Sequence, residues 1–369
     1  MALKYALIGC GRIAPNHMQS AQSNDLDIVA LCDLDDNKMI NLSSQFNLSE
    51  NVKHFQDYHK MIEELDIDLI AIATDSGSHA QIALDCMDMN IHLIIEKPIA
   101  LSLEDADLII NKAKEKKLVV SPSHQNRFNK SIQKVKKALD NQEFGKLFHG
   151  AAHIRWNRGP EYYSQDSWRG TWAHDGGALM NQCIHNIDLL RWLMGNEILE
   201  VYGVTDNLNH PNLETEDLGL AIVKFKNGSY GLIEGTNNVY PKNLEETLYI
   251  FGQNGTFKAG GKSVNIIEEW SIKDSAEDAE KVKKEFSEFP PNVYGFGHTP
   301  FYADVIDAIQ NNKEPYITAM DGRNALELVL AIYLSSIKSI SIKLPINDVS
   351  TISLKEDGND NFKNNKQKR

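Results

Sequence analysis

Glu96 and Lys97 follow directly after the apolar run of "IHLIIEKPIAL", and Pro98 comes next. Proline fixes the turn and biases the residue before it toward an extended backbone. A lysine at the carboxyl end of a central parallel strand lies where ligands bind, and its ammonium can stabilise a developing alkoxide. The alternative is an ordinary surface lysine that pairs with Glu96.

A second candidate is His185, in the stretch "GGALMNQCIHNIDLLRWLMG". The spacing predicts a helix over 178–194, with Gly195 as its C-terminal stop. At about 100° per residue, His185 lies in a narrow polar sector. Such a stripe is either a solvated face or part of a site. The polar sector holds Asn181, His185, Asp188 and Trp192, and the opposite side holds Leu179, Cys183, Ile187, Leu190 and Met194.

The stretch "LIGCGRIAPNHM" places small residues where a strand turns into a helix. Gly9 permits the tight turn, Gly11 lets the backbone approach a pyrophosphate, and Ala14 keeps the helix close to the sheet. Helix N–H groups then face the phosphates. Asp33 ends the next strand, where an acid binds the adenine ribose and repels a 2′-phosphate. The turn therefore predicts NAD, and an unliganded glycine turn is the alternative.

The segment "ATDSGSHAQIAL" follows another apolar strand-like block, so Ser76 and His79 are expected to approach the cofactor. An ordinary helix cap by Ser76 or Ser78 is the alternative reading. The predicted cofactor contacts are Gly9, Gly11, Arg12, Ile13, Asp33, Thr74, Ser76, His79, Glu96 and Lys97.

The elements that must position these residues form two patterns. Up to about residue 122, apolar runs alternate with helical stretches, which predicts a Rossmann domain with a doubly wound parallel sheet over 1–122. From 123 to 354 we expect an α+β domain with a largely antiparallel open sheet. Helices are expected at 129–141 and at about 322–338, the latter capped by Asp321 and packing back toward the first domain. The polar tail, 355–369, is predicted to be disordered.

The composition is that of an ordinary soluble protein of 369 residues, and its net charge of −13 disfavours nonspecific binding to nucleic acid or anionic membranes. No run of about 18 apolar residues predicts a membrane span. The four cysteines lie far apart, so neither a zinc site nor a disulfide framework is predicted, which fits a reducing cytoplasm.

Three motifs together resemble the Gfo/Idh/MocA oxidoreductases, named after glucose–fructose oxidoreductase, inositol dehydrogenase and rhizopine-catabolism types. They are the glycine turn, Glu96-Lys97-Pro98 and "HQNRFN" at 124–129. The resemblance extends over most of the chain, from about residue 4 to 345. It implies an NAD-dependent enzyme that oxidises a CH–OH group, with Lys97 at the reacting centre.

The family carries Asp-x-x-x-His on a helix like the one over 178–194, facing the nicotinamide. His185 matches this pattern, but Asn181 stands where the Asp is expected. An amide can hydrogen-bond a sugar hydroxyl, yet it can neither take a proton nor supply negative charge. Alcohol oxidation needs a base that titrates near neutrality, so we expect His185 as the base and Lys97 as the oxyanion stabiliser. The reverse assignment, with neutral Lys97 as the base, stays open.

An arginine-rich and aromatic block, residues 153–182, precedes and enters this helix. Arginines suit phosphate or carboxylate groups, whereas aromatic faces suit sugar rings or bases. A structural loop with core aromatics is the alternative. Together with Asn181, the block resembles bacterial sugar-nucleotide 3-dehydrogenases, which oxidise UDP-N-acetylglucosaminuronate (UDP-GlcNAcA) to a 3-keto sugar for lipopolysaccharide and other surface-polysaccharide precursors. The predicted substrate contacts are Arg127, Arg155, Arg158, Tyr163, Trp168, Arg169, Asn181 and His185.

By the same resemblance, some members retain NAD and regenerate it with 2-oxoglutarate, and members form tetramers through the open face of the second-domain sheet. We therefore expect a homo-oligomer with a nucleotide-sugar substrate and no metal. Two alternatives stay open: an NAD-dependent polyol or simple-sugar dehydrogenase, such as one acting on inositol, and a non-catalytic NAD-binding sensor.

Overall fold

The computed structural model describes residues 2–290 and 292–357, which fall into two compact units. The predicted boundary at 122 lies close to the observed one. The chain returns to the first unit with α10 (His298–Gln310) and the first turn of α11 (Ala319–Lys338), and the rest of α11 belongs to the second unit. The first unit comprises Met1–Ala100, Asp105–Gln125 and Phe296–Arg323, and the second Leu101–Glu104, Asn126–Gly295 and Asn324–Arg369.

The first unit contains a six-stranded parallel sheet in the order β3-β2-β1-β4-β5-β6, which confirms the predicted Rossmann-type domain. Its central strands are near-continuous apolar runs because both faces are covered. Only β3 was missed, since three residues at a sheet edge leave no periodic signal. The strands are β1 Lys4–Ile8, β2 Asp27–Cys32, β3 Lys53–Phe55, β4 Leu69–Ile72, β5 His92–Ile95 and β6 Val120–Pro122.

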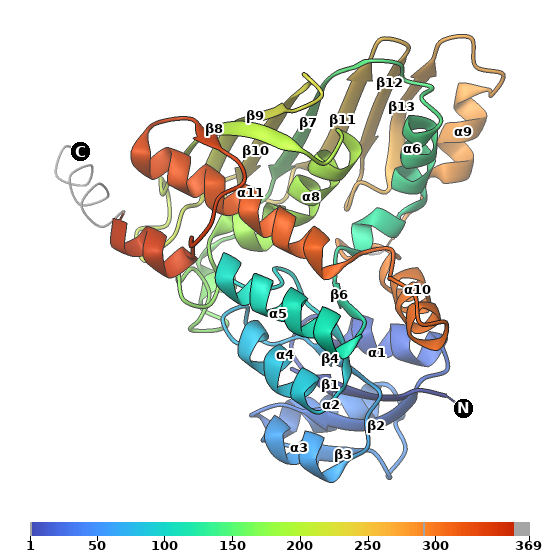
Figure 1. Cartoon of the computed structure of the whole chain (residues 1–369), viewed down its shortest axis with the longest axis vertical. Coiled ribbons are helices and arrows are strands. Elements are labelled where there is room, and N and C mark those ends of the chain that lie inside the picture. Colours follow the sequence, from blue (N-terminus) through green and yellow to red (C-terminus); the bar gives the residue numbers. More distant parts are fainter. Residues whose placement is uncertain (1, 291, 358–369) are drawn as a thin grey trace. The chain divides into compact units, whose positions relative to one another are not determined.

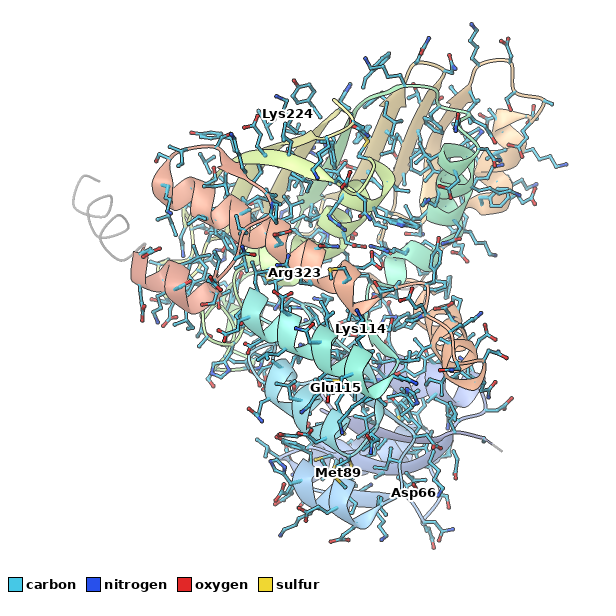
Figure 2. All side chains as sticks on the ribbon, viewed as in Figure 1. Asp66, Met89, Lys114, Glu115, Lys224 and Arg323 are labelled. Carbon is cyan, nitrogen blue, oxygen red and sulfur yellow. The ribbon has the colours of Figure 1, made fainter. Side chains whose placement is uncertain are left out.

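Helices follow the strands of this unit, and α1 packs against α10 (Figure 1). Asp35 caps α2 by accepting a hydrogen bond from the backbone of Asn37. Arg323, at the start of the last long helix, donates to the carboxylate of Asp107 on α5 (Figure 2). The helices are α1 Ala14–Ser23, α2 Asp36–Gln45, α3 Tyr58–Glu64, α4 His79–Asp88, α5 Leu103–Lys116 and α10 His298–Gln310.

The second unit contains an eight-stranded sheet in the order β13-β12-β11-β7-β10-β9-β8-β14. Every pairing is antiparallel except that of β7 with β10, so the prediction of a largely antiparallel sheet is confirmed. The strands are β7 Leu147–Arg155, β8 Ile198–Asp206, β9 Leu218–Phe225, β10 Tyr230–Thr236, β11 Glu245–Gly252, β12 Gly255–Gly260, β13 Ile266–Ile272 and β14 Ile342–Lys343.

Helices α6, α8 and α9 cover one face of this sheet (Figure 1). The other face carries apolar side chains in cross-strand rows, such as Tyr202, Ile222 and Leu232, which are between 43% and 56% exposed. Lys224 lies on β9 beside this apolar patch (Figure 2). The remaining helices are η1 Gln125–Phe128, α6 Lys130–Asp140, α7 Pro160–Tyr163, η2 Leu179–Cys183, α8 Ile184–Leu193, α9 Ala279–Phe286 and α11 Ala319–Lys338.

The predicted start of α11 and the predicted start of the disordered tail need correction. Asp321 is not the cap of α11, because the helix begins at Ala319. Instead, the Asp321 carboxylate accepts bonds from the backbone and hydroxyl of Thr318, and Thr318 caps the helix in return, as in a capping box. Residues 355–357 of the predicted tail are helical, and 358–369 lie outside the described residues. None of the described helices is long and apolar enough to span a membrane.

Candidate active site

The backbone of the glycine turn after β1 is accessible to a ligand. Gly9 has φ +95°, and a Cβ there would collide with the carbonyl of Ala73, so only glycine fits. A Cβ on Gly11 would meet no atom within 4 Å, so the backbone at this position faces open space. Arg12, which comes next, is exposed, and Ile13 precedes the first turn of α1. The turn therefore offers a backbone cradle of the kind that receives a pyrophosphate.

Asp33 is held at the carboxyl end of β2 by the same turn. One carboxylate oxygen accepts from the backbone of Cys10 at 2.8 Å, and the other from the backbone of Asp35 at 2.9 Å. The side chain is thus fixed between two loops and remains partly exposed. The glycine cradle and this fixed carboxylate fit the pyrophosphate and the adenine ribose of NAD.

His79 links two loops at the carboxyl ends of β4 and β5. Its Nδ1 lies 2.8 Å from the carbonyl of Pro98, and its Nε2 lies 3.3 Å from the carbonyl of Thr74. Burial lowers the pKa of His79, and a neutral ring donates to only one of the two carbonyls, so the shorter contact, to Pro98, fixes the loop that follows Lys97. The helix-cap alternative is not supported for Ser78, whose hydroxyl bonds Asp75 instead. Ser76 is buried in this loop.

Glu96 is buried, so the alternative interpretation, an exposed ion pair between Lys97 and Glu96, does not fit the position of this carboxylate. Its Oε1 lies 3.1 Å from Nε2 of His17 on α1. Behind His17, Nδ1 contacts the hydroxyl of Tyr302 at 2.6 Å, and Tyr302 contacts Tyr5 at 2.9 Å. Burial acts to raise the pKa of Glu96, but the hydrogen bond and charge of His17 outweigh it and hold the pKa well below its usual range.

The backbone amide of Lys97 donates to the other oxygen of Glu96 at 3.3 Å. The lysine itself is partly exposed. Lys97 therefore extends from a loop that is anchored on one side by Glu96 and on the other by His79, through Pro98. A side chain on so fixed a backbone is suited to a positioned role.

The helix that carries His185 begins with a π-helical turn, η2, which the 3.6-residue spacing did not predict. The predicted apolar side is confirmed, because Leu179, Cys183 and Ile187 are fully buried. On the polar side, Asn181 and His185 are partly exposed. The amide of Asn181 donates to Oδ1 of Asp175, a buried carboxylate in the preceding loop.

The C-terminal part of the polar sector, at Asp188, forms a buried ion pair and is not a solvated face. Arg127 donates from Nε and Nη2 to the two oxygens of Asp188, at 2.7 and 2.6 Å, and both side chains are almost fully buried. The Arg127 guanidinium also lies over the ring of Trp192, 4.7 Å from its centroid. These contacts assign Arg127 a structural task within the second unit.

The arginines of the 153–182 block differ in their partners. Arg155 bonds the carboxylates of Glu234 and Glu245, whereas Ile154, its neighbour in β7, is buried beneath the helices. Because strand side chains alternate, Arg155 lies on the open face of the sheet, opposite α8. This placement makes it the weakest of the predicted substrate contacts.

Arg158 and Arg169 lie among aromatic rings instead. Arg158 stacks over Trp156 and Tyr162 and donates to the side-chain oxygen of Asn243. Arg169 stacks over Tyr162 and Trp168, and it bonds Asp166 and the hydroxyl of Tyr162. Tyr163 accepts a hydrogen bond from Asn237, whose amide also reaches Gln182 on η2. The block is thus an ordered cationic and aromatic surface next to the helix that carries His185.

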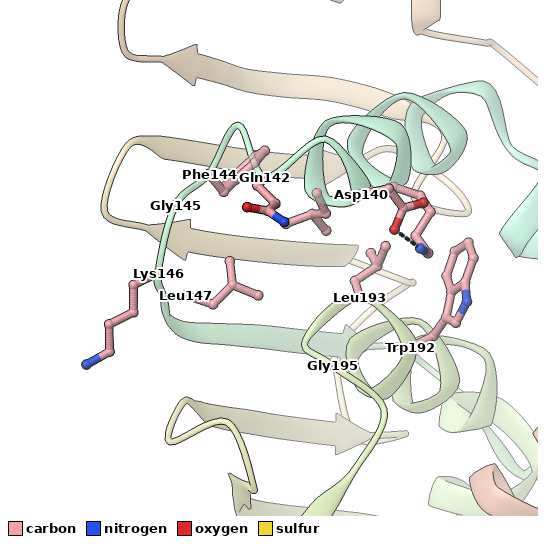
Figure 3. Close-up of a pocket in the computed structure, with 11 residues that line it drawn as sticks. Asp140, Gln142, Phe144, Gly145, Lys146, Leu147, Trp192, Leu193 and Gly195 are labelled. Carbon is pink, nitrogen blue, oxygen red and sulfur yellow. Dashed lines mark hydrogen bonds and ion pairs between the residues drawn. The ribbon is translucent and has the colours of Figure 1, made fainter.

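A separate hollow of about 520 Å³ lies at the other end of α8 (Figure 3). It is lined by Trp192, Leu193 and residues of the loop between α6 and β7, and Asp140 there pairs with Lys136. None of the predicted catalytic or cofactor residues lines it.

Comparison with known proteins bears on both halves of the chain. The model of the oxidoreductase family's NAD-binding Rossmann fold matches residues 3–124, and that of the family's C-terminal alpha/beta domain matches residues 136–344. The chain belongs to the Gfo/Idh/MocA oxidoreductase family. It is therefore an NAD-dependent oxidoreductase with an NAD-binding Rossmann domain, as the sequence predicted.

Two solved structures of family members resemble the whole chain. They are the WlbA dehydrogenases from Bordetella pertussis and Chromobacterium violaceum, each in complex with NADH and UDP-GlcNAcA. Both are 32% identical over 94% of this chain, with 99% and 97% of their own lengths covered and TM-scores of 0.86 and 0.85. Myo-inositol 2-dehydrogenase from Thermotoga maritima is 23% identical, over 93% of this chain and 98% of its own length.

The buried partners of Glu96 and of the helix that carries Asn181 were not predicted from the sequence. His17 is 79 positions from Glu96 in the chain, and nothing in the local pattern links the two. Asp175 stands just before the Gly176-Gly177 turn signal, which could have marked a loop folding back onto the helix. Glu216, buried beside this loop, accepts from the backbone of Leu179 at 2.7 Å, and its burial was unexpected for a carboxylate.

Proposed function

We propose that this family member oxidises the C3 hydroxyl of a sugar nucleotide, UDP-GlcNAcA, to the 3-keto sugar as a step in bacterial surface-polysaccharide precursor synthesis. The observation that carries the proposal is the 32% identity, over 94% of the chain, to two WlbA dehydrogenases that bind NADH and UDP-GlcNAcA. The Asn181 and His185 pattern on η2 and α8 and the arginine–aromatic block next to it agree with this substrate class.

In the proposed reaction, His185 takes the proton of the C3 hydroxyl and Lys97 stabilises the oxygen as negative charge develops on it. When NAD is bound, it supplies the two-electron acceptor. Gly9, Gly11 and Asp33 hold it, and the loop fixed by His79 and Glu96 presents Lys97. Asn181 hydrogen-bonds the sugar, because an amide serves as donor and acceptor but not as a base.

For the anionic parts of the substrate, we propose Arg158 and Arg169, with Tyr163 and Trp168 against the sugar or base. Arg158 is held by oxygens of Asn157 and Asn243 and stacks on Trp156, and a planar guanidinium suits a phosphate or carboxylate. The carboxylates of Glu234 and Glu245 already neutralise Arg155.

A substrate panel with point variants tests the proposal. Wild-type protein is given NAD with UDP-GlcNAcA, other UDP-sugars, inositols and free sugars, with and without 2-oxoglutarate as a recycling acceptor, and products are read by mass. We expect a loss of two mass units from UDP-GlcNAcA alone. His185→Ala should lower kcat by about 100-fold or more, the usual scale for a general base, and Lys97→Met should also lower it strongly. Wild-type turnover by either variant would contradict its role.

A second candidate is a polyol dehydrogenase, favoured by the match to myo-inositol 2-dehydrogenase over 93% of the chain. Turnover of inositols but not of UDP-sugars would establish it. NAD binding with no oxidation of any sugar would instead indicate a sensor.

We also propose that a second copy of the chain covers the open face of the β7–β14 sheet. Six apolar side chains there are between 39% and 56% exposed, which is unusual for a face in contact with water: Tyr202, Val204, Leu220, Ile222, Tyr230 and Leu232. A tetramer built on this face would be seen by light scattering.

We place the enzyme in the cytoplasm, where its four free, buried cysteines stay reduced.

A further inference from the structure

Asp175 is a buried carboxylate fixed at two points next to the helix that carries His185. It is 2% exposed, and its Oδ2 accepts from the backbone of Gly170 at 2.6 Å. Its Oδ1 accepts from the side-chain amide of Asn181. The two glycines that follow, Gly176 and Gly177, have φ of +82° and +98°, so the loop can turn sharply between Asp175 and the helix.

This contact dictates how the amide of Asn181 is oriented. An ionised carboxylate only accepts hydrogen bonds, so the NH₂ group of Asn181 must face Asp175. The amide oxygen then lies at the opposite end of the side chain, directed away from Asp175. An asparagine without such a partner can exchange its two ends at little cost, because they are nearly equal in shape.

A second buried carboxyl group in this region shows where the negative charge resides. Glu216 is 1% exposed, and its Oε1 accepts from Leu179 and from the hydroxyl of Tyr333, at 2.7 and 2.9 Å. Burial raises the pKa of Glu216 to about 8, and the charge of Asp175 adds to this effect. Glu216 is therefore neutral at pH 7, next to the hydrogen-bonded carboxylate of Asp175.

We propose that Asp175 is a positioning residue for the dehydrogenase site, which rests on the function proposed above. It fixes the Asn181 amide so that this side chain presents only an acceptor oxygen to a substrate hydroxyl. It also supplies, one hydrogen bond away, the negative charge that an aspartate at position 181 would carry on the helix itself. The carboxylate thus comes from the loop, at Asp175, and the helix carries the amide of Asn181 in its place.

An exchange of the two side chains tests this directly. Asn181→Asp alone sets two carboxylates against each other, and Asp175→Asn alone lets the Asn181 amide turn. We expect each to lower kcat/KM by about 10-fold or more, on the scale of contacting pairs. The double exchange D175N/N181D restores one donor and one acceptor, so kcat/KM should recover at least about 5-fold relative to N181D. Its rate should also gain a new ionisation at acidic pH, when Asp at 181 takes a proton.

Binding measurements make the test independent of turnover. Calorimetry of UDP-GlcNAcA with the NADH-loaded protein should give a dissociation constant about 5- to 10-fold higher for D175N and restored in the exchange. The affinity for NADH alone, held by the other unit, should stay at the wild-type value in every variant and so reports folding.

A matched control is the exposed Asp307–Asn311 pair on α10, bonded at 2.6 Å; its exchange should change neither rate nor binding. The proposal is overturned if D175N keeps the wild-type kcat/KM and pH profile, or if the exchange is no better than N181D. If wild-type protein binds UDP-GlcNAcA but oxidises nothing, the proposed function fails, while the calorimetric comparison still decides the role of Asp175.

Discussion

Glu96 in the first unit and Glu216 in the second are two buried glutamates with opposite electrostatics. Both residues are at most 8% exposed. His17 holds the pKa of Glu96 well below its usual range against the effect of burial, whereas burial raises the pKa of Glu216 to about 8. The partners of Glu216 are a backbone amide and a tyrosine hydroxyl, which are neutral.

The difference shows that the partner, rather than burial, decides the charge of these carboxyl groups. Near Lys97 the chain keeps an ionised carboxylate, which anchors the lysine loop. Near Asn181 it keeps a neutral carboxyl group, Glu216, next to the hydrogen-bonded side chain of Asp175.

The strongest test of this contrast compares two isosteric variants. Glu96→Gln removes the buried carboxylate that contacts His17 and should lower the free energy of unfolding by about 1.5–3 kcal/mol at pH 7, since a hydrogen bond to a charged group is lost. Glu216→Gln replaces a group that is already neutral and keeps an acceptor for Leu179 and Tyr333. It should change stability by less than about 1 kcal/mol or raise it. Urea unfolding measures both, and equal losses would contradict the contrast.

A second effect of the same contrast is expected in the pH dependence of stability. Because the folded pKa of Glu216 lies near 8 and the unfolded value near 4.5, the folded state binds the extra proton between these limits. Its contribution to stability should therefore fall as pH rises through this window, by at most about 1.4 kcal/mol per pH unit, and level off above pH 8. Relative to wild type, Glu216→Gln should gain stability between about pH 5 and 9.

Glu96 should behave in the opposite sense. Its folded pKa is lowered, so its contribution is fully present above the unfolded value and is lost as pH falls below it. The cost of Glu96→Gln should thus shrink on the acid side of about pH 4.5. If the unfolding free energies of the two variants run parallel across the pH range, the assigned charges are wrong.

The parts of the fold that the sequence predicted are those with local signals. The continuous apolar runs of β1, β4 and β5 and the glycine turn after β1 lie next to each other in the chain, so the Rossmann domain could be read directly. In the second unit, apolar and polar residues alternate along β9 to β12, and turn signals separate these strands. The sequence did not predict the other strands of this sheet, β7, β8, β13 and β14.

The residues proposed to react stand in local motifs, whereas the residues that support them could not be predicted from the sequence. Lys97 and His185 stand in motifs, whereas the contacts that hold their surroundings join distant positions, such as Arg127 with Asp188, 61 residues apart. The polar stripe looked uniform at 100° per residue. The structure divides it into a partly exposed upper end at Asn181 and His185 and a buried ion pair below, and the π turn of η2 cannot be inferred from a 3.6-residue period.

The central claim is that this chain removes hydrogen from C3 of a sugar nucleotide and passes it to NAD. The most direct measurement incubates the purified protein with NAD and UDP-GlcNAcA that carries deuterium at C3, followed by mass spectrometry of the extracted cofactor and sugar. The account predicts a reduced cofactor that carries the deuterium and a 3-keto sugar that has lost it. Reduced cofactor without the label, or deuterium retained at C3 of an unreacted sugar after prolonged incubation with folded, NAD-binding protein, would contradict it.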